Sequence, residues 1–246
     1  MIRTVNESGV TAISLARPEK KNALTPAMQG DLIAAVNTAA TDPTCRAILL
    51  RGEGDAFCSG FDLSLCRDDD NVLRELLSGL SRAIVALRAA PQPVVIAAHG
   101  AAIAGGCALL GGGDYVVTDA AAKIGYPVVR LGISPAVSAP FLLPHVGPAA
   151  ARARMLDPTL IDGREANRIG LAHECAATAG EAASRAEQIA AELAAKPTVG
   201  LRATKQWLNE LDGSDQAGAA ERALSVSLGL VGSAEQAERL AQLWTR

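Results

Sequence analysis

The sequence predicts an α/β protein in which a core of alternating strands and helices precedes a helical C-terminal region. Short apolar runs alternate with amphipathic helical patterns through the first two-thirds of the 246 residues, and from about Pro148 onward the pattern is nearly all helical. With 49% hydrophobic and 20% charged residues, the chain is long enough to bury one large core. We expect residues 1–195 to form this core and residues 196–246 to form the helical region.

The first elements are two strands on either side of a helix. Val10–Leu15 and Ala47–Leu50 are rich in aliphatic and β-branched residues, which is typical of strands. Between them, Thr25 before Pro26 indicates a helix start, because a threonine side chain caps a helix and proline fits its first turn. The helix that follows has its apolar residues on one face: Met28, Leu32, Ala35 and Val36.

A longer amphipathic helix is predicted over residues 72–87. Its apolar residues recur at helical spacing: Val72, Leu76, Leu80, Ile84 and Leu87. Pro91 and Pro93 end this helix, and Val94–Ala98 is a continuous apolar run typical of a strand that is buried on both faces. The glycine-containing segment after it predicts a turn and then a helix, and Tyr115–Val117 is a further strand.

After Ala122–Tyr126 we expect no further strands. Helices are predicted over Gly163–Ile169 and Glu181–Ala195, and more helices follow the break at Lys196-Pro197 and continue to Trp244. This region is rich in alanine and leucine, and only 3% of the chain is aromatic, so it has few large side chains to bury within itself. We therefore expect it to pack against other copies of the chain.

Composition excludes several classes of partner. A net charge of −3, without a run of Lys or Arg, excludes a nucleic-acid interface. The five cysteines show no CxxC spacing and the histidines form no spaced set, so we expect no metal site and a reducing cytoplasmic location. The nearly uncharged stretch Pro93–Gly113 is interrupted by glycines, so we expect no membrane span.

Two glycine-containing segments, Phe57–Leu63 and His99–Leu109, indicate the position of a functional site. Small residues allow a backbone to approach a ligand closely, and the second segment runs into a helix start, where unpaired N–H groups favour negative charge. Two peptide N–H groups that converge on one point form an oxyanion hole. We expect the segments to meet in this way, although such glycines also occur in ordinary turns and close packing.

Several segments, taken in order, resemble the crotonase superfamily, also called the enoyl-CoA hydratase/isomerase superfamily: Arg17–Leu24, Phe57–Leu63, Gly100–Leu109, Tyr126–Pro135, and Ile161–Ala166 with Ile169–Leu171. The resemblance implies a crotonase-like ββα spiral core with a C-terminal helical oligomerisation region, assembled as a homotrimer or a dimer of trimers. It also implies an acyl-CoA thioester as substrate or ligand, with no cofactor besides the CoA that the substrate carries.

In this family two backbone N–H groups polarise the thioester carbonyl and stabilise an enolate. Carried over by the resemblance, these donors are the N–H groups of Phe61 and Gly105. Asp62 and Asp114 resemble positions that brace the local backbone. The resemblance also implies a set of substrate-binding residues: Lys20, Lys21, Ala23, Ser59, Gly60, Asp62, Leu63, Ala104, Gly106, Val128 and Leu131.

The resemblance fails at two acid–base positions. Family hydratases have glutamates at the positions that Ala108 and Val128 occupy here. Neither side chain transfers a proton, and adding water to a double bond needs both a base and an acid, so we expect no efficient hydratase. Asp68–Asp70 and His99 are candidate replacements; the alternatives are a solvated acidic loop and a hydrogen-bonded core histidine.

Two functions remain open at this point. The first is an acyl-CoA lyase or isomerase whose reaction needs mainly carbonyl polarisation, so that isomerisation, decarboxylation and thioester chemistry all fit. The second is a non-catalytic protein that binds acyl-CoA without turnover. A hydrolase triad has no support, because Ser59 lies in no GxSxG motif.

Overall fold

A six-stranded sheet lies at the centre of the chain. The computed structural model describes residues 1–67, 69–214 and 217–244. The sheet has the order β1-β2-β3-β4-β6-β8, with β1 antiparallel to β2 and the other neighbours parallel. Its strands are β1 (Ile2–Glu7), β2 (Val10–Leu15), β3 (Ala47–Gly52), β4 (Val94–Ala98), β6 (Tyr115–Asp119) and β8 (Glu174–Ala176). A second sheet pairs β5 (Ala101–Ile103) with β7 (Lys123–Gly125).

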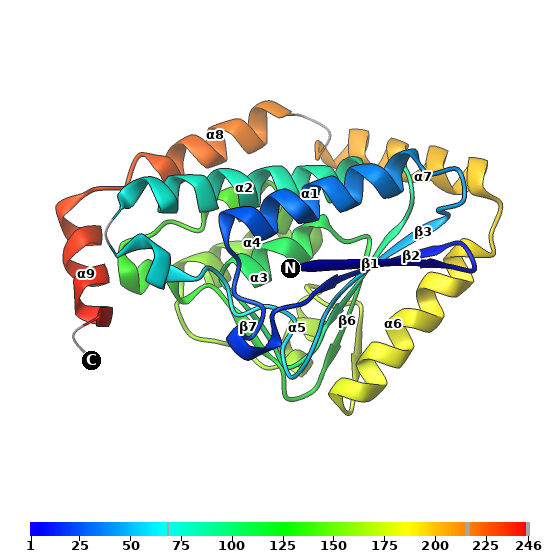
Figure 1. Cartoon of the computed structure of the whole chain (residues 1–246), viewed down its shortest axis with the longest axis horizontal. Helices are drawn as coiled ribbons and strands as arrows, with labels where there is room; N and C mark the ends of the chain where they lie inside the picture. Colours follow the sequence, from blue (N-terminus) through cyan, green and yellow to red (C-terminus); the bar gives the residue numbers. More distant parts are fainter. Residues whose placement is uncertain (68, 215–216, 245–246) are drawn as a thin grey trace.

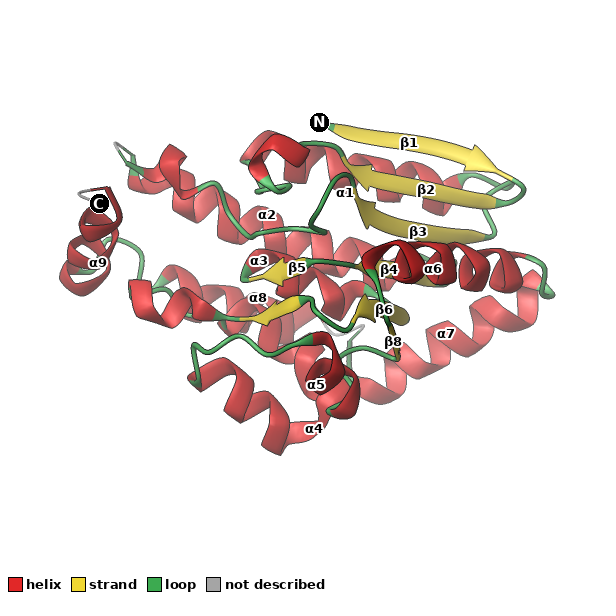
Figure 2. Cartoon of the chain, turned by 90° about the horizontal axis from the view of Figure 1, so that it is seen from below, coloured by secondary structure: helices red, strands yellow, loops and turns green. Residues whose placement is uncertain are grey.

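Helices lie on both sides of the main sheet (Figures 1 and 2). The α-helices are α1 (Pro26–Thr41), α2 (Asp70–Ala89), α3 (Gly105–Leu109), α4 (Ala139–Leu156), α5 (Gly163–Arg168), α6 (Ala179–Ala194), α7 (Thr198–Asp212), α8 (Ala217–Leu228) and α9 (Ala234–Trp244). Short 3₁₀ turns are η1 (Pro18–Lys20), η2 (Leu63–Cys66), η3 (Leu110–Gly112), η4 (Pro127–Leu131) and η5 (Ala136–Ser138). In Figure 1, α1 and α2 lie above the strands and α6 lies below them.

The two covered faces explain the continuous apolar runs of β3 and β4. Successive side chains along a strand point to opposite faces of the sheet. Ile48 and Ile96 pack in the larger core with α1 and α2, whereas Leu49 and Val95 pack with the buried side of α6. A strand of this kind has no polar alternation, and the prediction of a doubly buried strand at Val94–Ala98 is confirmed.

The predicted start of the first helix is also confirmed. Helix α1 begins at Pro26, and the Thr25 side chain accepts a hydrogen bond from the Met28 N–H at 3.1 Å. Leu32 and Val36 are completely buried on its inner face. The cap and the apolar spacing therefore set both the start and the orientation of this helix.

The expectation of no strands after Tyr126 is wrong, because β8 follows α5. This strand has three residues, Glu174–Ala176, and pairs in parallel with β6 in the register Val117↔Glu174. All three residues are only partly buried, so the segment has no apolar run and is too short to show a period of two. Pairing with an existing sheet edge, rather than local preference, makes it a strand.

The C-terminal helices are attached to the core through buried charges. Lys205 on α7 pairs with Asp114 at 2.7 Å and donates to the carbonyl oxygen of Gln92 at 2.9 Å. Asp114 also accepts a hydrogen bond from the Val94 N–H at 2.7 Å, so this one carboxylate braces β4 and holds α7. Burial lowers the pKa of Lys205 from its usual value, and the nearby carboxylate of Asp114 opposes that shift.

Two further features concern only the described residues. None of their helices is both long enough and apolar enough to cross a membrane. No group of three or more His, Cys, Asp or Glu side chains within the same ranges is arranged to hold a metal ion.

Replacing Lys205 with methionine tests the attachment of α7. The variant keeps the apolar stem but removes one partner of the partly buried Asp114 carboxylate, which still contacts Arg88 and the Val94 N–H, so the free energy of unfolding should fall by about 2 kcal/mol in chemical denaturation. The matched control is Lys196→Met at an exposed position, with an expected change within about 0.5 kcal/mol. Equal stability of the two variants would show that the pair does not hold α7.

Candidate active site

The two glycine-containing segments lie side by side. The Cys58 N–H donates to the Ala101 carbonyl oxygen at 2.9 Å, and the Ile103 N–H donates back to the Cys58 carbonyl oxygen at 3.0 Å. A Cβ atom on Gly106 would lie only 2.3 Å from that same Cys58 oxygen. A Cβ on Gly60, where φ is 101°, would lie 3.0 Å from the Ala104 side chain. Glycine is therefore needed at both positions for the segments to approach this closely.

This approach brings together the N–H groups of Phe61 and Gly105. A Cβ on Gly60 would be 3.6 Å from the Gly105 nitrogen, and a Cβ on Gly105 would be 3.0 Å from the Phe61 ring. Within the described part of the chain, neither N–H group donates a hydrogen bond. Gly105 is the first residue of α3, where an N–H has no partner inside the helix. The site thus contains two free backbone donors from two adjacent loops.

Ala104, immediately before the second donor, has a strained backbone. Its φ of 53° and ψ of −112° are rarely adopted by a residue with a side chain, and such a conformation costs about 1–3 kcal/mol. The Ala104 N–H donates to Gly125 at 2.8 Å, and its carbonyl oxygen accepts from the Ala108 N–H at 2.9 Å. These bonds hold the bend that sets the direction of the Gly105 N–H.

A small cavity lies beside these donors. Its volume is about 20 Å³, which is room for one water molecule. Ala108 and Val128 both line it. No lining residue from the described chain carries a carboxylate, imidazole, ammonium or guanidinium group; the lining consists of Phe61, Leu77, Leu80, Ala104, Gly105, Ala108, Tyr126, Val128, Ile133, Ser134, Pro135, Val137 and Ser138.

The polar side chains of this lining are hydroxyls. Burial raises the pKa of Tyr126 well above its usual value, so its phenol stays neutral. Cys107 follows Gly106 in the sequence and is completely buried. Burial raises the pKa of its thiol to about 12. A thiolate nucleophile at Cys107 is therefore excluded near neutral pH.

The cavity includes only some of the residues expected to contact substrate. Phe61, Ala104, Gly105, Ala108 and Val128 line it. The remaining candidates lie outside its lining: Lys20, Lys21, Ala23, Ser59, Gly60, Asp62, Leu63, Gly106 and Leu131. Sequence reasoning missed the contributions of α2 and η5, which are Leu77, Leu80, Val137 and Ser138. For α2, the helical spacing indicated a buried face but not that this face borders a cavity.

The segment Arg17–Leu24 is attached to the first glycine loop. Asp62 pairs with Arg17 at 2.7 Å, the Leu24 N–H donates to the Gly60 carbonyl oxygen at 2.7 Å, and the Ser59 N–H donates to that of Lys21 at 3.0 Å. Burial acts to raise the pKa of Asp62, but the hydrogen bond from the Ser64 hydroxyl and the Arg17 guanidinium together lower it below its usual value. These contacts give Asp62 a bracing role next to Phe61.

Neither Asp69 nor His99, the two candidate replacements whose side chains are described, lines the cavity. Asp68 lies outside the described residues, and the Asp69 carboxylate caps α2 by accepting a hydrogen bond from the Asn71 N–H at 2.8 Å. Asp70 is the first residue of α2, and nothing is described of its side chain. His99 is buried, with Nε2 at 2.9 Å from the Gly54 carbonyl oxygen.

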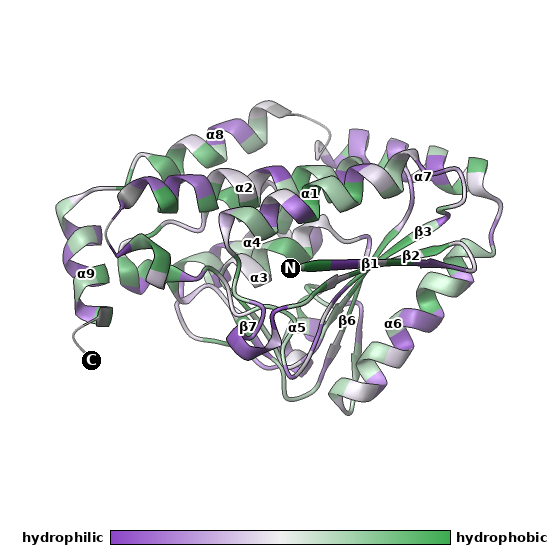
Figure 3. Cartoon of the chain, in the orientation of Figure 1, coloured by the Kyte–Doolittle hydropathy of each residue, from purple (hydrophilic) through white to green (hydrophobic). Residues whose placement is uncertain are grey.

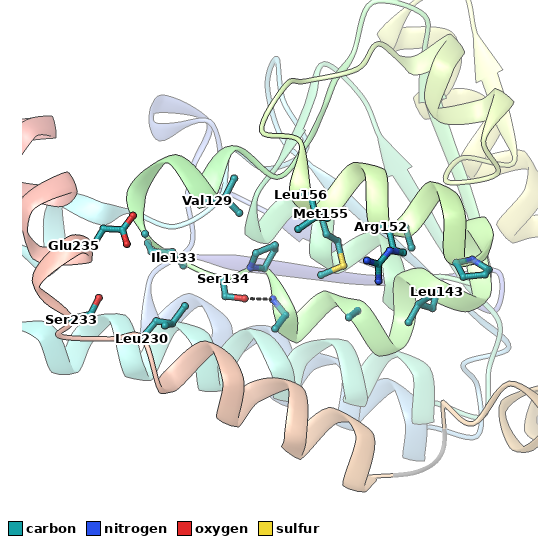
Figure 4. Close-up of a pocket in the computed structure, with 16 residues that line it drawn as sticks. Val129, Ile133, Ser134, Leu143, Arg152, Met155, Leu156, Leu230, Ser233 and Glu235 are labelled. Atoms are coloured by element: carbon teal, nitrogen blue, oxygen red, sulfur yellow. Dashed lines mark hydrogen bonds between the residues drawn. The ribbon is translucent and has the colours of Figure 1, made fainter.

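A larger cavity lies on the other side of the segment Ile133–Pro135 (Figure 4). Its volume is about 660 Å³, and it lies between α4, η4, the segment that links α8 to α9, and the first turn of α9. Figure 4 shows Ser134 with its hydroxyl bonded to the backbone of Ala136, a contact of 3.2 Å. Ile133, Ser134 and Pro135 line both cavities and separate them.

The chain is similar to known proteins over most of its length. The enoyl-CoA hydratase/isomerase family model matches residues 5–230. The chain is 31% identical over 222 residues to 1,2-epoxyphenylacetyl-CoA isomerase of Escherichia coli, covering 84% of this chain and 80% of that protein. It is 28% identical over 207 residues to crotonyl-CoA hydratase of Syntrophomonas wolfei, covering 83% of this chain and 79% of that protein.

Solved structures give the same result for the fold. A crystal structure of an enoyl-CoA hydratase/isomerase from Xanthobacter autotrophicus Py2 superposes with a TM-score of 0.89 at 28% identity, covering 99% of this chain and 93% of that chain. The predicted crotonase-like α/β fold is thereby confirmed. From the extent of the family match and the identity to its members, the chain belongs to the enoyl-CoA hydratase/isomerase family.

Proposed function

We propose that this protein binds an acyl-CoA thioester and stabilises the enolate of its acyl group through the N–H groups of Phe61 and Gly105. The observation that carries the proposal is the pair of adjacent, unpartnered backbone donors beside a cavity. Preorganised donors of this kind do not reorganise as negative charge develops, and one of them contributes about 10²–10³ in rate.

We propose further that the reaction depends on carbonyl polarisation rather than on the acid–base chemistry of a hydratase. Ala108 and Val128 line the cavity where hydration requires proton-transferring groups. The relatives do not select one reaction, since an isomerase and a hydratase match at 31% and 28% identity. Isomerisation, decarboxylation and thioester chemistry therefore stay open.

One observation favours a second candidate, a protein that binds acyl-CoA without turnover. Among the described residues that line the cavity, none has a side chain that titrates near neutral pH: none carries an acidic group, and the Tyr126 phenol stays protonated. For both functions we propose that the CoA phosphates bind near Lys20 and Lys21, which are exposed on the segment attached to the first loop. We also propose a cytoplasmic location, with which the five free cysteines agree.

The thioester carbonyl itself tests the proposed hole. Butyryl-CoA and the thioether S-butyl-CoA differ in the carbonyl group that the two N–H groups would bind. Two hydrogen bonds of about 1 kcal/mol each give the thioester an advantage of about 30-fold in calorimetric affinity. If neither compound nor free CoA binds at millimolar concentration, the proposed function is wrong. Equal binding of butyryl-CoA and S-butyl-CoA would exclude the oxyanion hole but not the binding of acyl-CoA.

Ala104→Gly tests whether strain orients the second donor. Glycine adopts the Ala104 conformation without strain, so the variant should be more stable by about 1 kcal/mol. The affinity advantage of butyryl-CoA over S-butyl-CoA should fall below about tenfold, because the Gly105 N–H is then held less firmly. Ala101→Gly in β5 is the control. This variant should be less stable, because glycine weakens a strand, but its affinity advantage for butyryl-CoA over S-butyl-CoA should not change. A variant that keeps the full advantage would show that strain has no part in orienting the donor.

Hydration of crotonyl-CoA should be very slow in the unmodified protein. Losing a positioned acid and a positioned base costs about 10⁴ or more, which places kcat below about 0.1 s⁻¹. The double variant Ala108→Glu with Val128→Glu should gain some activity, limited by the burial of two carboxylates. A kcat within the ordinary range of about 1–10³ s⁻¹ would show that another group, with Asp68–Asp70 the first to examine, transfers the proton.

We propose that the chain assembles as a homotrimer or a dimer of trimers through its C-terminal helices. Large apolar side chains on α7 and α8 are more than half exposed in the single chain: Val199, Trp207, Leu208, Leu211 and Val226. Exposed apolar groups of this extent are typical of interaction surfaces.

Light scattering tests this assembly. The native mass should equal three or six chains, and Leu211→Glu should shift it toward the monomer, because a carboxylate would be buried at the interface. Val5→Glu is a control at a similarly exposed apolar position on β1, outside the C-terminal helices, and should leave the mass unchanged. A stable monomer of the unmodified protein would remove the proposal.

A further inference from the structure

A buried asparagine joins the segments around the first glycine loop. Asn22 lies just after the hydrophilic turn η1, which contains no buried residue (Figure 3), yet Asn22 itself is 0% exposed. Its Oδ1 accepts a hydrogen bond from the Arg17 N–H at 2.8 Å. Its Nδ2 donates to two carbonyl oxygens, that of Glu53 at 2.9 Å and that of Ala56 at 2.8 Å. Both carbonyls lie between the end of β3 and the loop that carries the first backbone donor, Phe61.

This bonding pattern fits a carboxamide and few other side chains. A carboxamide offers one oxygen that accepts and one nitrogen that donates two hydrogen bonds, and Asn22 uses all three. A carboxylate would place an acceptor against two carbonyl oxygens, and an aliphatic side chain would donate to neither of them. Asn22 also has a φ of 55°, a left-handed conformation that asparagine adopts more readily than most residues. Bonding and backbone conformation therefore favour the same residue.

Backbone hydrogen bonds continue this connection on either side of Asn22. The Lys21 carbonyl oxygen accepts from the Ser59 N–H at 3.0 Å, and the Leu24 carbonyl oxygen accepts from the Asp62 N–H at 2.9 Å. Ser59 and Asp62 flank the first donor in the sequence. Because that donor makes no hydrogen bond of its own among the described residues, the bonds around it set its direction.

Asn22 also acts through Arg17. The Arg17 guanidinium pairs with Asp62 at 2.7 Å and donates to the Ala23 carbonyl oxygen at 3.1 Å. Asp62 directly follows Phe61. Asn22 thus fixes the backbone of the residue whose side chain braces the loop just after the donor.

We infer that Asn22 is a positioning residue, which sets the direction of the Phe61 N–H by holding Arg17–Leu24 and the start of the first loop in one arrangement. Asn22 is buried and touches no ligand itself. The Gly105 N–H belongs to the second loop, to which the Asn22 side chain makes no hydrogen bond. Loss of the Asn22 bonds should therefore weaken one of the two donors and leave the other. This inference rests on the proposed binding of an acyl-CoA thioester to the two N–H groups.

The affinity of butyryl-CoA relative to that of S-butyl-CoA tests the inference by calorimetry. Asn22→Asp keeps the acceptor for the Arg17 N–H but turns the donor into a second acceptor. Asn22→Gly removes all three side-chain bonds and keeps the freedom to adopt the left-handed conformation. Each variant should retain one effective hydrogen bond to the thioester carbonyl, so the advantage of butyryl-CoA should fall from about 30-fold to about fivefold.

Gln92→Glu is the matched control. Gln92 is also completely buried, and its Nε2 donates to the carbonyl oxygens of Ala39 at 3.0 Å and Cys45 at 3.3 Å. These bonds lie before the start of β3, whereas those of Asn22 lie just after its end. The substitution inverts a buried donor and adds a negative charge as Asn22→Asp does. It should lower the unfolding temperature but keep the 30-fold advantage of butyryl-CoA.

Hydrogen exchange in the free protein is a second measurement, which needs no ligand. In both Asn22 variants the backbone amides of Phe57–Leu63 should exchange about fivefold faster or more, while those of Cys107–Leu109 and of β4 keep their rates. An equal change in both regions, or a variant that does not fold, would show that Asn22 supports the whole core. Either result would overturn the inference.

The binding results are equally decisive. The inference is overturned if either Asn22 variant keeps the full advantage of butyryl-CoA, or if Gln92→Glu loses it to the same extent. In both cases acyl-CoA still binds, and the proposed function stands. Equal binding of butyryl-CoA and S-butyl-CoA to the unmodified protein would overturn the inference together with the oxyanion hole. Absence of binding for both compounds and for free CoA would instead reject the proposed function itself.

Discussion

The close approach of two backbones is the constraint on which the site depends. The loop around Cys58 pairs with β5 on one side and leaves room for α3 only because Gly60 and Gly106 have no side chains. Without this approach the N–H groups of Phe61 and Gly105 would belong to two unrelated loops. Strands β3 and β4 are neighbours in the main sheet, so the first loop, which follows β3, lies next to β5, which follows β4.

Holding two donors without partners is unfavourable for the free protein. The strained conformation of Ala104 adds to that cost. The doubly covered sheet offsets these costs, since β3 and β4 bury apolar side chains against α1 and α2 on one face and α6 on the other. Stability is therefore concentrated in the sheet, and strain in the loops that leave it.

The long elements could be predicted because periodicity is strong over many residues. Helices α1 and α2 and strand β4 follow from apolar spacing and from caps, whereas β8 is an edge strand whose pairing decides its structure. In the site, Phe61 and Gly105 were found through family resemblance, since no local pattern marks an N–H as a donor. Leu77 and Leu80 could not be placed at the cavity from sequence, because helical spacing indicates a buried face but not what that face borders.

The small size of the active-site cavity has a consequence for the rate at which ligands associate. The two backbone donors are already adjacent, but a cavity with room for one water does not hold even a short acyl chain. In the proposed function, entry of an acyl chain therefore requires side chains of the cavity lining to move aside, and binding that waits for such a change is slower than simple docking. Association should accordingly proceed in two steps, with the CoA moiety held at the surface before its acyl group enters.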